Sequence, residues 1–360
     1  MQAATAVIDF SALAHNVSRI REVASDSRIL AVLKANAYGH GLIEIAEKLD
    51  DVDAFGVARI EEALNLRKGG VVKPIVLLEG FFNADDIPVL VANNIQTIIH
   101  HEQQLTMLLA AQVEHPIHVW LKVDTGMHRL GIDPDMLPDY YERLSSSANV
   151  ASPVKLMTHF GCADDVENPV TAKQIAAFST LTANLAGEVS MANSAGIIAW
   201  PASHRDWVRP GLMMYGVTPM INQASDAIDL QPVMTLKSSL IAIRQVKRGD
   251  SVGYGAAWTA SEDTSIGVVA IGYGDGYPRH AENGTPVLIG GKLFPLVGRV
   301  SMDMITVDLG TMPDAEVGDD VILWGKGLPV EVIAEHSSTI AWELLCNITR
   351  RVAFEYQDGR

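Results

Sequence analysis

Lys34 is the residue whose position in the sequence most directly suggests chemistry. It follows the apolar run ILAVL (29–33) and begins the segment KANAYGHG. A lysine that emerges from a buried strand is partly desolvated, which favours the neutral amine that forms Schiff bases. The same position also suits a structural lysine that extends its ammonium group to solvent. Both interpretations stay open for this residue taken alone.

Small-residue turns after other apolar runs predict a phosphate site. The turn 39–41 (Gly-His-Gly) can approach an anion closely. The segment 194–196 (Ser-Ala-Gly) follows the seventh apolar run, and 210–212 (Pro-Gly-Leu) follows Arg209 in the eighth. Backbone N–H groups in such loops suit a phosphate group. A Schiff-base lysine together with a phosphate site predicts pyridoxal phosphate as the cofactor.

The apolar runs predict the scaffold that positions these residues. Runs that are apolar on both faces and alternate with helices indicate a buried parallel sheet, and eight in succession favour a closed barrel over an open sheet. We therefore expect an α/β protein with an N-terminal (β/α)8 TIM-type barrel. The eight runs are ILAVL (29–33), AFGVA (54–58), PIVLL (74–78), QTIIH (96–100), IHVWLKV (117–123), VKLMTH (154–159), VSMAN (189–193) and WVRPGLMMYG (207–216).

Polar side chains stand at or just after the carboxyl end of each run. In a barrel these ends converge on one face, where barrel enzymes place their active sites. Eight such positions together predict a site on that face. They are occupied by Lys34, Arg59, Glu79, His100, Lys122 with Asp124, His159, Asn193 with Ser194, and Arg209.

Helical spacing is clearest near the N-terminus, where Leu13, Val17 and Ile20 follow Ser11, the expected N-cap. The segments 42–49 and 175–185 repeat a similar pattern.

After residue 230 the sequence changes to short strands separated by Gly, Pro and Asp turns, with a hairpin signal at Gly290-Gly291 and a helical stretch near 330–346. We therefore expect a barrel over residues 1–230 and a C-terminal mostly-β domain over 231–360.

Composition narrows the classes of partner. Lys and Arg number 27 against 43 Asp and Glu, a formal net charge of −16, which argues against nucleic acid and anionic membranes as partners. Cys162 and Cys346 form no cluster, so we expect no disulfide scaffold, and we predict no metal site. Neither a secretion signal nor an apolar run of the ~20 residues that span a membrane occurs, so we expect a cytoplasmic protein.

Eight strings, in order and with characteristic spacing, make the sequence similar to bacterial alanine racemases. They are AVLKANAYGHG, LKVDTGMHRLG, THF, NSAG, WVRPG, VGYG, GYGDGYPR and GRVSMDM. The similarity extends from about residue 5 to 355 and implies a pyridoxal-phosphate barrel followed by a β domain. It also implies a homodimer with shared active sites that interconverts L-alanine and D-alanine by a two-base mechanism, supplying D-alanine for peptidoglycan.

The resemblance assigns roles to four catalytic residues. Lys34 would bind the cofactor as an aldimine and act as the base on the D side, and Tyr254 of the partner subunit would act on the L side. His159 would contact that tyrosine and also Arg209, which would face the pyridine nitrogen. Taken without the resemblance, Tyr254 reads as a hairpin tyrosine and Arg209 as a structural arginine paired with Asp206.

Further roles follow from the same resemblance. Arg129 would bind the substrate carboxylate with help from the backbone of Met302. Lys122 would carry a carbamate that orients the arginine, although a simple pair with Asp124 is the structural alternative. The matching phosphate ligands are Tyr38, Ser194, Gly211 and Leu212, and the residues matching the substrate corridor are Tyr273, Asp164, Arg279 and Arg299.

Trp342 departs from the family pattern, which usually has a tyrosine that contacts the phosphate at this place.

Alternative functions are a broader-specificity amino-acid racemase, a basic-amino-acid decarboxylase and a class I aldolase, which needs no cofactor. A non-catalytic pyridoxal-phosphate-binding protein is a further alternative from a different class. The second domain, with Tyr254 and Met302, argues against the last of these.

Overall fold

Eight parallel strands close into a barrel, as the apolar runs predict. The computed structural model describes residues 3–221, 223–311 and 313–358. Strand β9 returns to β2, with Trp207 opposite Arg28, so the barrel has no free edge. In order, the barrel strands are β2 (Arg28–Val32), β3 (Ala54–Val57), β4 (Ile75–Leu77), β5 (Ile95–Ile99), β6 (Ile117–Lys122), β7 (Val150–Met157), β8 (Val189–Ser190) and β9 (Trp207–Val208).

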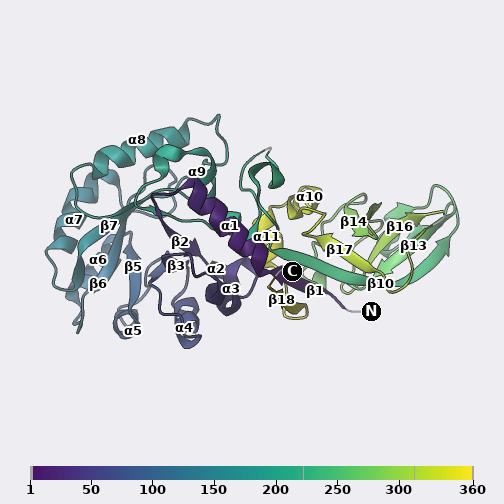
Figure 1. Cartoon of the computed structure of the whole chain (residues 1–360), viewed down its shortest axis with the longest axis horizontal. Helices are drawn as coiled ribbons and strands as arrows, with labels where there is room; N and C mark the ends of the chain where they lie inside the picture. Colours follow the sequence, from purple (N-terminus) through teal and green to yellow (C-terminus); the bar gives the residue numbers. More distant parts are fainter. Residues whose placement is uncertain (1–2, 222, 312, 359–360) are drawn as a thin grey trace.

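Helices surround the barrel and cover the outer face of its strands (Figure 1). The apolar stripe of α1 (Phe10–Val23) includes Leu13, Val17 and Ile20, all buried. Its N-cap is Asp9, whose Oδ1 accepts from the backbone N–H groups of Ser11 (2.9 Å) and Ala12 (3.2 Å), so the expected cap at Ser11 is wrong. The other helices here are α3 (Leu42–Lys48), α4 (Ile60–Lys68), α5 (Asp86–Ala92), α6 (Glu102–Ala110), α7 (Leu137–Ser145), α8 (Val170–Thr182) and α9 (Ser194–Ala199).

The second half of the chain forms a mostly antiparallel β domain, as expected. A tight hairpin joins β14 to β15 through Gly290 (φ 56°) and Gly291 (φ 78°), left-handed angles that glycine adopts without strain. Its elements are β10 (Met234–Val246), β11 (Ser251–Val252), β12 (Trp258–Thr259), β13 (Thr264–Val269), β14 (Pro286–Ile289), β15 (Lys292–Pro295), β16 (Ile305–Gly310), β17 (Asp320–Trp324), α10 (Val330–His336), α11 (Ala341–Cys346) and β18 (Ala353–Gln357).

The first strand of the chain lies in the sheet of the second domain. Strand β1 (Thr5–Asp9) pairs antiparallel with β10 and parallel with β18, with Thr5 opposite both Lys237 and Ala353. A division of the chain into residues 1–230 and 231–360 stays a prediction, and β1 is the element that such a division does not describe. Only long-range pairing decides where this strand goes.

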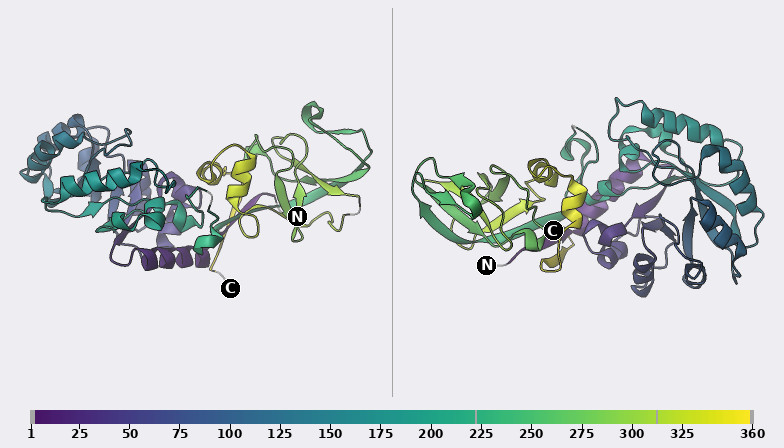
Figure 2. Two further views of the ribbon diagram at one scale, coloured as in Figure 1. Left: turned by 90° about the horizontal axis from the view of Figure 1, so that it is seen from above. Right: turned by 180° about the vertical axis from the view of Figure 1, so that it is seen from behind.

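The barrel and the β domain form two lobes placed end to end, with α11 between them (Figure 2). Helix α11 packs directly against the segment after β2: a Cβ added at Gly39 would lie 2.1 Å from the carbonyl oxygen of Leu345. The β domain therefore forms one wall of the end of the barrel at which β2 finishes.

Candidate active site

A cavity of about 590 Å³ opens at the carboxyl ends of the barrel strands, where the sequence predicts the site. Three expected strand-end residues, Arg59, His100 and Asp124, do not line it. Arg59 pairs with Glu79 (3.3 Å), and His100 lines a smaller neighbouring cavity that Glu79 also borders. The predicted residues that do line the main cavity are Lys34, Tyr38, Glu79, Lys122, Arg129, His159, Asn193, Ser194, Arg209, Gly211 and Leu212.

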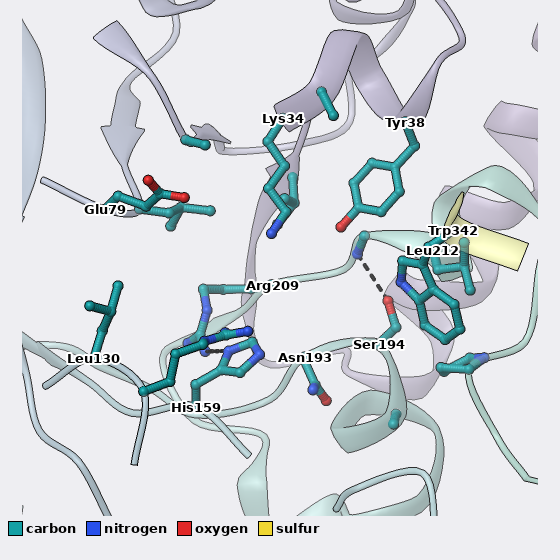
Figure 3. Close-up of a pocket in the computed structure, with 18 of the residues that line it drawn as sticks. Lys34, Tyr38, Glu79, Leu130, His159, Asn193, Ser194, Arg209, Leu212 and Trp342 are labelled. Atoms are coloured by element: carbon teal, nitrogen blue, oxygen red, sulfur yellow. Dashed lines mark hydrogen bonds between the residues drawn. The ribbon is translucent and has the colours of Figure 1, made fainter. Parts of the chain in front are cut away.

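Lys34 and Tyr38 enter the cavity from one unusual turn, α2 (Lys34–Tyr38). Residues 35–38 all have φ between 52° and 56°, a left-handed conformation that costs roughly 1–2 kcal/mol for each residue that is not glycine. Asn36 stabilises the turn, because its Oδ1 accepts from the backbone N–H of Leu42 (2.9 Å). The turn directs both side chains into the same cavity (Figure 3). Periodicity in the sequence gives no sign of this backbone.

Tyr38, Ser194 and Gly211 form a cradle of hydrogen-bonding groups. The Ser194 Oγ accepts from the backbone N–H groups of Gly211 (2.9 Å) and Met213 (3.3 Å), so the loop is ordered around it. A Cβ at Gly211 would lie only 2.6 Å from the Tyr38 hydroxyl, so this position needs glycine for the approach. Burial raises the pKa of Tyr38, which keeps its hydroxyl a donor. The hydroxyl groups of Tyr38 and Ser194 can each donate a hydrogen bond, and such donors fit a phosphate group.

Arg209 and His159 lie below Lys34 in the same cavity (Figure 3). Arg209 is 5% exposed, and its Nη1 donates to Ser190 Oγ (2.6 Å) while its Nη2 donates to the Thr158 carbonyl (2.6 Å). Burial lowers the pKa of Arg209 to about 10, so the guanidinium stays charged at neutral pH. The alternative prediction, an ion pair between Arg209 and Asp206, is wrong: no such pair occurs among the described residues. The Asp206 carboxylate accepts instead from the backbone N–H of Val189 (2.8 Å).

The environment of His159 keeps its imidazole neutral. Burial, followed by the positive charges of Arg209, Lys122, Arg129 and Lys34, holds the pKa of His159 well below its usual value. Nη2 of Arg209 lies 3.3 Å from His159 Nδ1. Because a guanidinium can only donate, Nδ1 must accept, and the imidazole hydrogen is therefore on Nε2.

Lys122 adds a further positive charge to the cavity. It is 7% exposed, and burial together with the charges of Arg209, Arg129 and Lys34 lowers its pKa to about 8. Among the described residues, Asp124 does not form the ion pair with Lys122 that was the structural alternative. Its Oδ1 accepts instead from the backbone N–H groups of Gly126 (2.8 Å), Met127 and His128, and so orders the loop that leads to Arg129. Two lysines and two arginines line the cavity together with the carboxylate of Glu79, so the cavity is suited to anionic ligands; they are Lys34, Lys122, Arg129 and Arg209.

Tyr254 and Met302 lie outside this cavity, on the β domain of the same chain. Their side chains are 71% and 52% exposed. The Arg299 guanidinium lies beside the Tyr254 loop, 3.1 Å from the position of a Cβ at Gly255. Tyr273 and Arg279 line a separate cavity of about 360 Å³. One chain therefore does not bring its own Tyr254 to its own Lys34.

Helix α11 contributes residues that close the cavity on the side of the β domain. Trp342 lines it near Leu212 and Ser194 (Figure 3). Cys346, which the sequence reasoning did not place at the site, lines it as well. The signal was present in the sequence, because residues four apart on a helix share a face and Cys346 follows Trp342 by four. Asp164, expected in the substrate corridor, does not line the cavity and accepts through its carbonyl from the backbone N–H of Ile221.

The described part of the chain contains neither a cluster of metal ligands nor a membrane-spanning helix. Within residues 3–221, 223–311 and 313–358, no three His, Cys, Asp or Glu side chains are grouped so that they could hold a metal ion. No helix within those ranges is both long and apolar enough to cross a membrane.

The closed barrel, the cationic cavity at its carboxyl end and the attached β domain define a two-domain barrel enzyme. Comparison with known families names it more closely: the model for the alanine racemase N-terminal domain matches residues 8–219, and that for the alanine racemase C-terminal domain matches 233–356. The chain belongs to the alanine racemase family, the pyridoxal-phosphate-dependent racemases, and is thus an isomerase.

Individual relatives are similar along the whole chain. The alanine racemase of Photobacterium profundum is 57% identical over 358 residues, covering 99% of this chain and 100% of the relative. That of Vibrio cholerae serotype O1 is also 57% identical, covering 99% of both chains. The crystal structure of the biosynthetic alanine racemase from Pseudomonas aeruginosa matches with a TM-score of 0.96 at 44% identity, covering 99% of this chain and 100% of that one.

Proposed function

We propose that this protein is an alanine racemase that interconverts L-alanine and D-alanine with pyridoxal phosphate, supplying D-alanine for peptidoglycan. The observation that carries the proposal is the cavity in which Lys34 faces Arg209 and His159 beside the donor cradle of Tyr38 and Ser194. Relatives named alanine racemase match the chain over nearly its full length, which supports alanine as the substrate.

The residues of the cavity fit pyridoxal phosphate. When bound, this cofactor supplies an electron-withdrawing system that acidifies the α-hydrogen of an amino acid. Lys34 would hold it covalently, and Tyr38, Ser194 and the backbone of Gly211 and Leu212 would hold its phosphate. The Arg209 guanidinium would donate to the ring nitrogen. Because arginine does not give up its proton at neutral pH, that nitrogen would stay unprotonated, which limits side reactions.

Racemisation needs one base on each face of the substrate, because a proton removed from one face must be replaced on the other. The Lys34 amine would move the proton on the D side. Tyr254 of the partner subunit would do so on the L side, which its 71% exposure in a single chain permits. His159 would donate from Nε2 to the phenolate of that tyrosine and so stabilise it.

Substrate binding would use Arg129, which a carbamate on Lys122 would orient. Arg129 would bind the carboxylate of alanine, together with the backbone of Met302 from the partner subunit. Lys122 would carry a carbamate, for which its lowered pKa of about 8 is favourable, since only a neutral amine adds carbon dioxide. Tyr273, Arg279 and Arg299 of the partner subunit, with Asp164, would line the substrate corridor. The functional unit would then be a homodimer.

The test is chiral analysis of the product formed from L-alanine by protein loaded with pyridoxal phosphate. We expect D-alanine from the wild-type protein and none from Lys34→Ala. Borohydride reduction and peptide mapping should place the cofactor on Lys34. Parallel assays with serine, lysine and arginine test the alternative of broader specificity. Formation of no D-alanine by cofactor-loaded wild-type protein, or a cofactor label on Lys122, would refute the proposal.

A further inference from the structure

Glu62 connects the ends of two neighbouring barrel strands through its carboxylate. It lies in the first turn of α4, half-buried. One carboxylate oxygen, Oε1, accepts from the backbone N–H of Ala35 (2.7 Å), the residue after Lys34. The other, Oε2, accepts from the backbone N–H groups of Ala58 (2.9 Å) and Arg59 (3.1 Å), just after β3. A carboxylate that only capped α4 would need Oε2 alone.

The bond to Ala35 reaches the start of the left-handed turn that carries Lys34 and Tyr38. This turn has little room to relax on its other side, because α11 packs against Gly39 through the Leu345 carbonyl. An unfavourable backbone conformation persists only when its surroundings hold it in place. Glu62 anchors the first peptide of the turn, and charge-assisted hydrogen bonds of this kind are stronger than neutral ones.

We propose that Glu62 is a positioning residue that holds the turn in place. It thereby keeps Lys34 and Tyr38 at the spacing needed to bind the two ends of one cofactor molecule. The inference rests on the proposed function, because it takes pyridoxal phosphate as the molecule held. Glu62 does not line the cavity and acts only through the backbone of the turn.

The test compares Glu62→Gln with Glu61→Gln, an exposed carboxylate on the same helix. Glutamine has one acceptor oxygen, so it can serve only one of the two strand ends. We expect Glu62→Gln to lose pyridoxal phosphate on dialysis roughly tenfold faster or more. The visible circular dichroism for each bound cofactor should also fall, because the cofactor would be less rigidly oriented. Glu61→Gln should match the wild-type protein in both measurements.

Ala35→Gly distinguishes positioning from general stabilisation. Glycine adopts the left-handed conformation without strain, so it should partly restore cofactor retention and the dichroism in the Glu62→Gln protein. A role confined to capping α4 predicts no such rescue. If Glu62→Gln alone does not fold, the effect of Glu62→Gln is measured in the Ala35→Gly background, where it should still exceed that of Glu61→Gln.

The outcomes separate this inference from the proposed function. Equal retention and dichroism in the Glu62→Gln and Glu61→Gln proteins, with a wild-type protein that holds the cofactor and racemises alanine, would overturn the positioning role alone. A wild-type protein that neither holds the cofactor nor racemises alanine would overturn the proposed function.

Discussion

Trp342 occupies the position where the resemblance described above leads us to expect a tyrosine. It lines the cavity beside Ser194 and Leu212, the proposed phosphate ligands (Figure 3). A tyrosine hydroxyl here could donate to the phosphate. The indole N–H is also a donor but is carried at a different point of a larger ring. Compared with tyrosine, tryptophan would therefore present its donor at a different point and add bulk to the wall of the cavity.

We expect Trp342→Tyr to hold pyridoxal phosphate more tightly and to accept serine better relative to alanine. A hydrogen bond to a charged group contributes ~1.5–3 kcal/mol, which corresponds to a roughly 10- to 150-fold change in affinity. Cofactor loss on dialysis and the ratio of serine to alanine rates measure the two effects. Equal or faster loss from the Tyr variant would show that the indole already binds the phosphate.

Lys122 gives the stability of the protein a distinct pH dependence. Its pKa in the folded protein is about 8, below the usual lysine value of 10.5. Between these two values the unfolded chain binds more protons, so stability rises with pH; below pH 8 the full cost of burying the charge remains. In bicarbonate-free buffer at pH 7, Lys122→Met should therefore be more stable than wild type by up to about 3 kcal/mol.

The measurement is denaturant unfolding of both proteins between pH 7 and pH 10. The advantage of Lys122→Met should shrink as pH rises, because the lysine of the wild-type protein then becomes neutral. Bicarbonate should narrow the difference at pH 7 by converting the amine to a carbamate. A difference that stays constant with pH would show that burial of this charge costs nothing.

At the scale of elements, the left-handed turn and the loop after β9 meet at one point. The Tyr38 hydroxyl lies where a side chain at Gly211 would be. Gly211→Ala should displace Tyr38, weaken its bond to the phosphate and speed cofactor loss by roughly 10- to 150-fold. Fluorescence of the released cofactor follows this loss.

Tyr38→Phe supplies the control for this steric conflict. It removes the oxygen 2.6 Å from the added methyl and leaves the ring carbon, at 3.2 Å, as the next contact. Gly211→Ala should therefore cost less in the Tyr38→Phe background than in the wild type. Strictly additive effects would mean that the two residues do not meet in the cofactor-loaded protein.

At the scale of the whole molecule, the exposed Tyr254 and the cavity of its own chain lie apart, which predicts complementation between subunits. Lys34→Ala and Tyr254→Phe should each be nearly inactive alone. Mixed under conditions of subunit exchange, they should regain activity, because each heterodimer contains one site with both an intact Lys34 and an intact Tyr254. Absence of recovery despite demonstrated exchange would place both bases in one chain.

Much of the architecture can be predicted from local patterns in the sequence. Each of the eight barrel strands overlaps its predicted run, and the Gly290-Gly291 hairpin and the helices near 330–346 form where their patterns predict. The run 207–216 is the main exception in extent, because it forms a strand only at Trp207–Val208 and a 3₁₀ helix at Leu212–Tyr215. Apolar periodicity and turn chemistry are local signals, so they can be read without knowing the fold. Barrel closure brings strand-end side chains such as Lys122 and Arg209 into one cavity, whereas Lys34 reaches that cavity from the left-handed turn.

Features that depend on residues far apart in the chain become visible only in the folded protein. Strand β1 joins β10 and β18 by pairing that no local pattern encodes. The left-handed backbone at 35–38 lies against Leu345 and Glu62, and Arg209 bonds to Thr158 and Ser190 rather than to the nearby Asp206. In each case the local preference is weak, and the hydrogen bonds and packing that overcome it form only once distant segments meet.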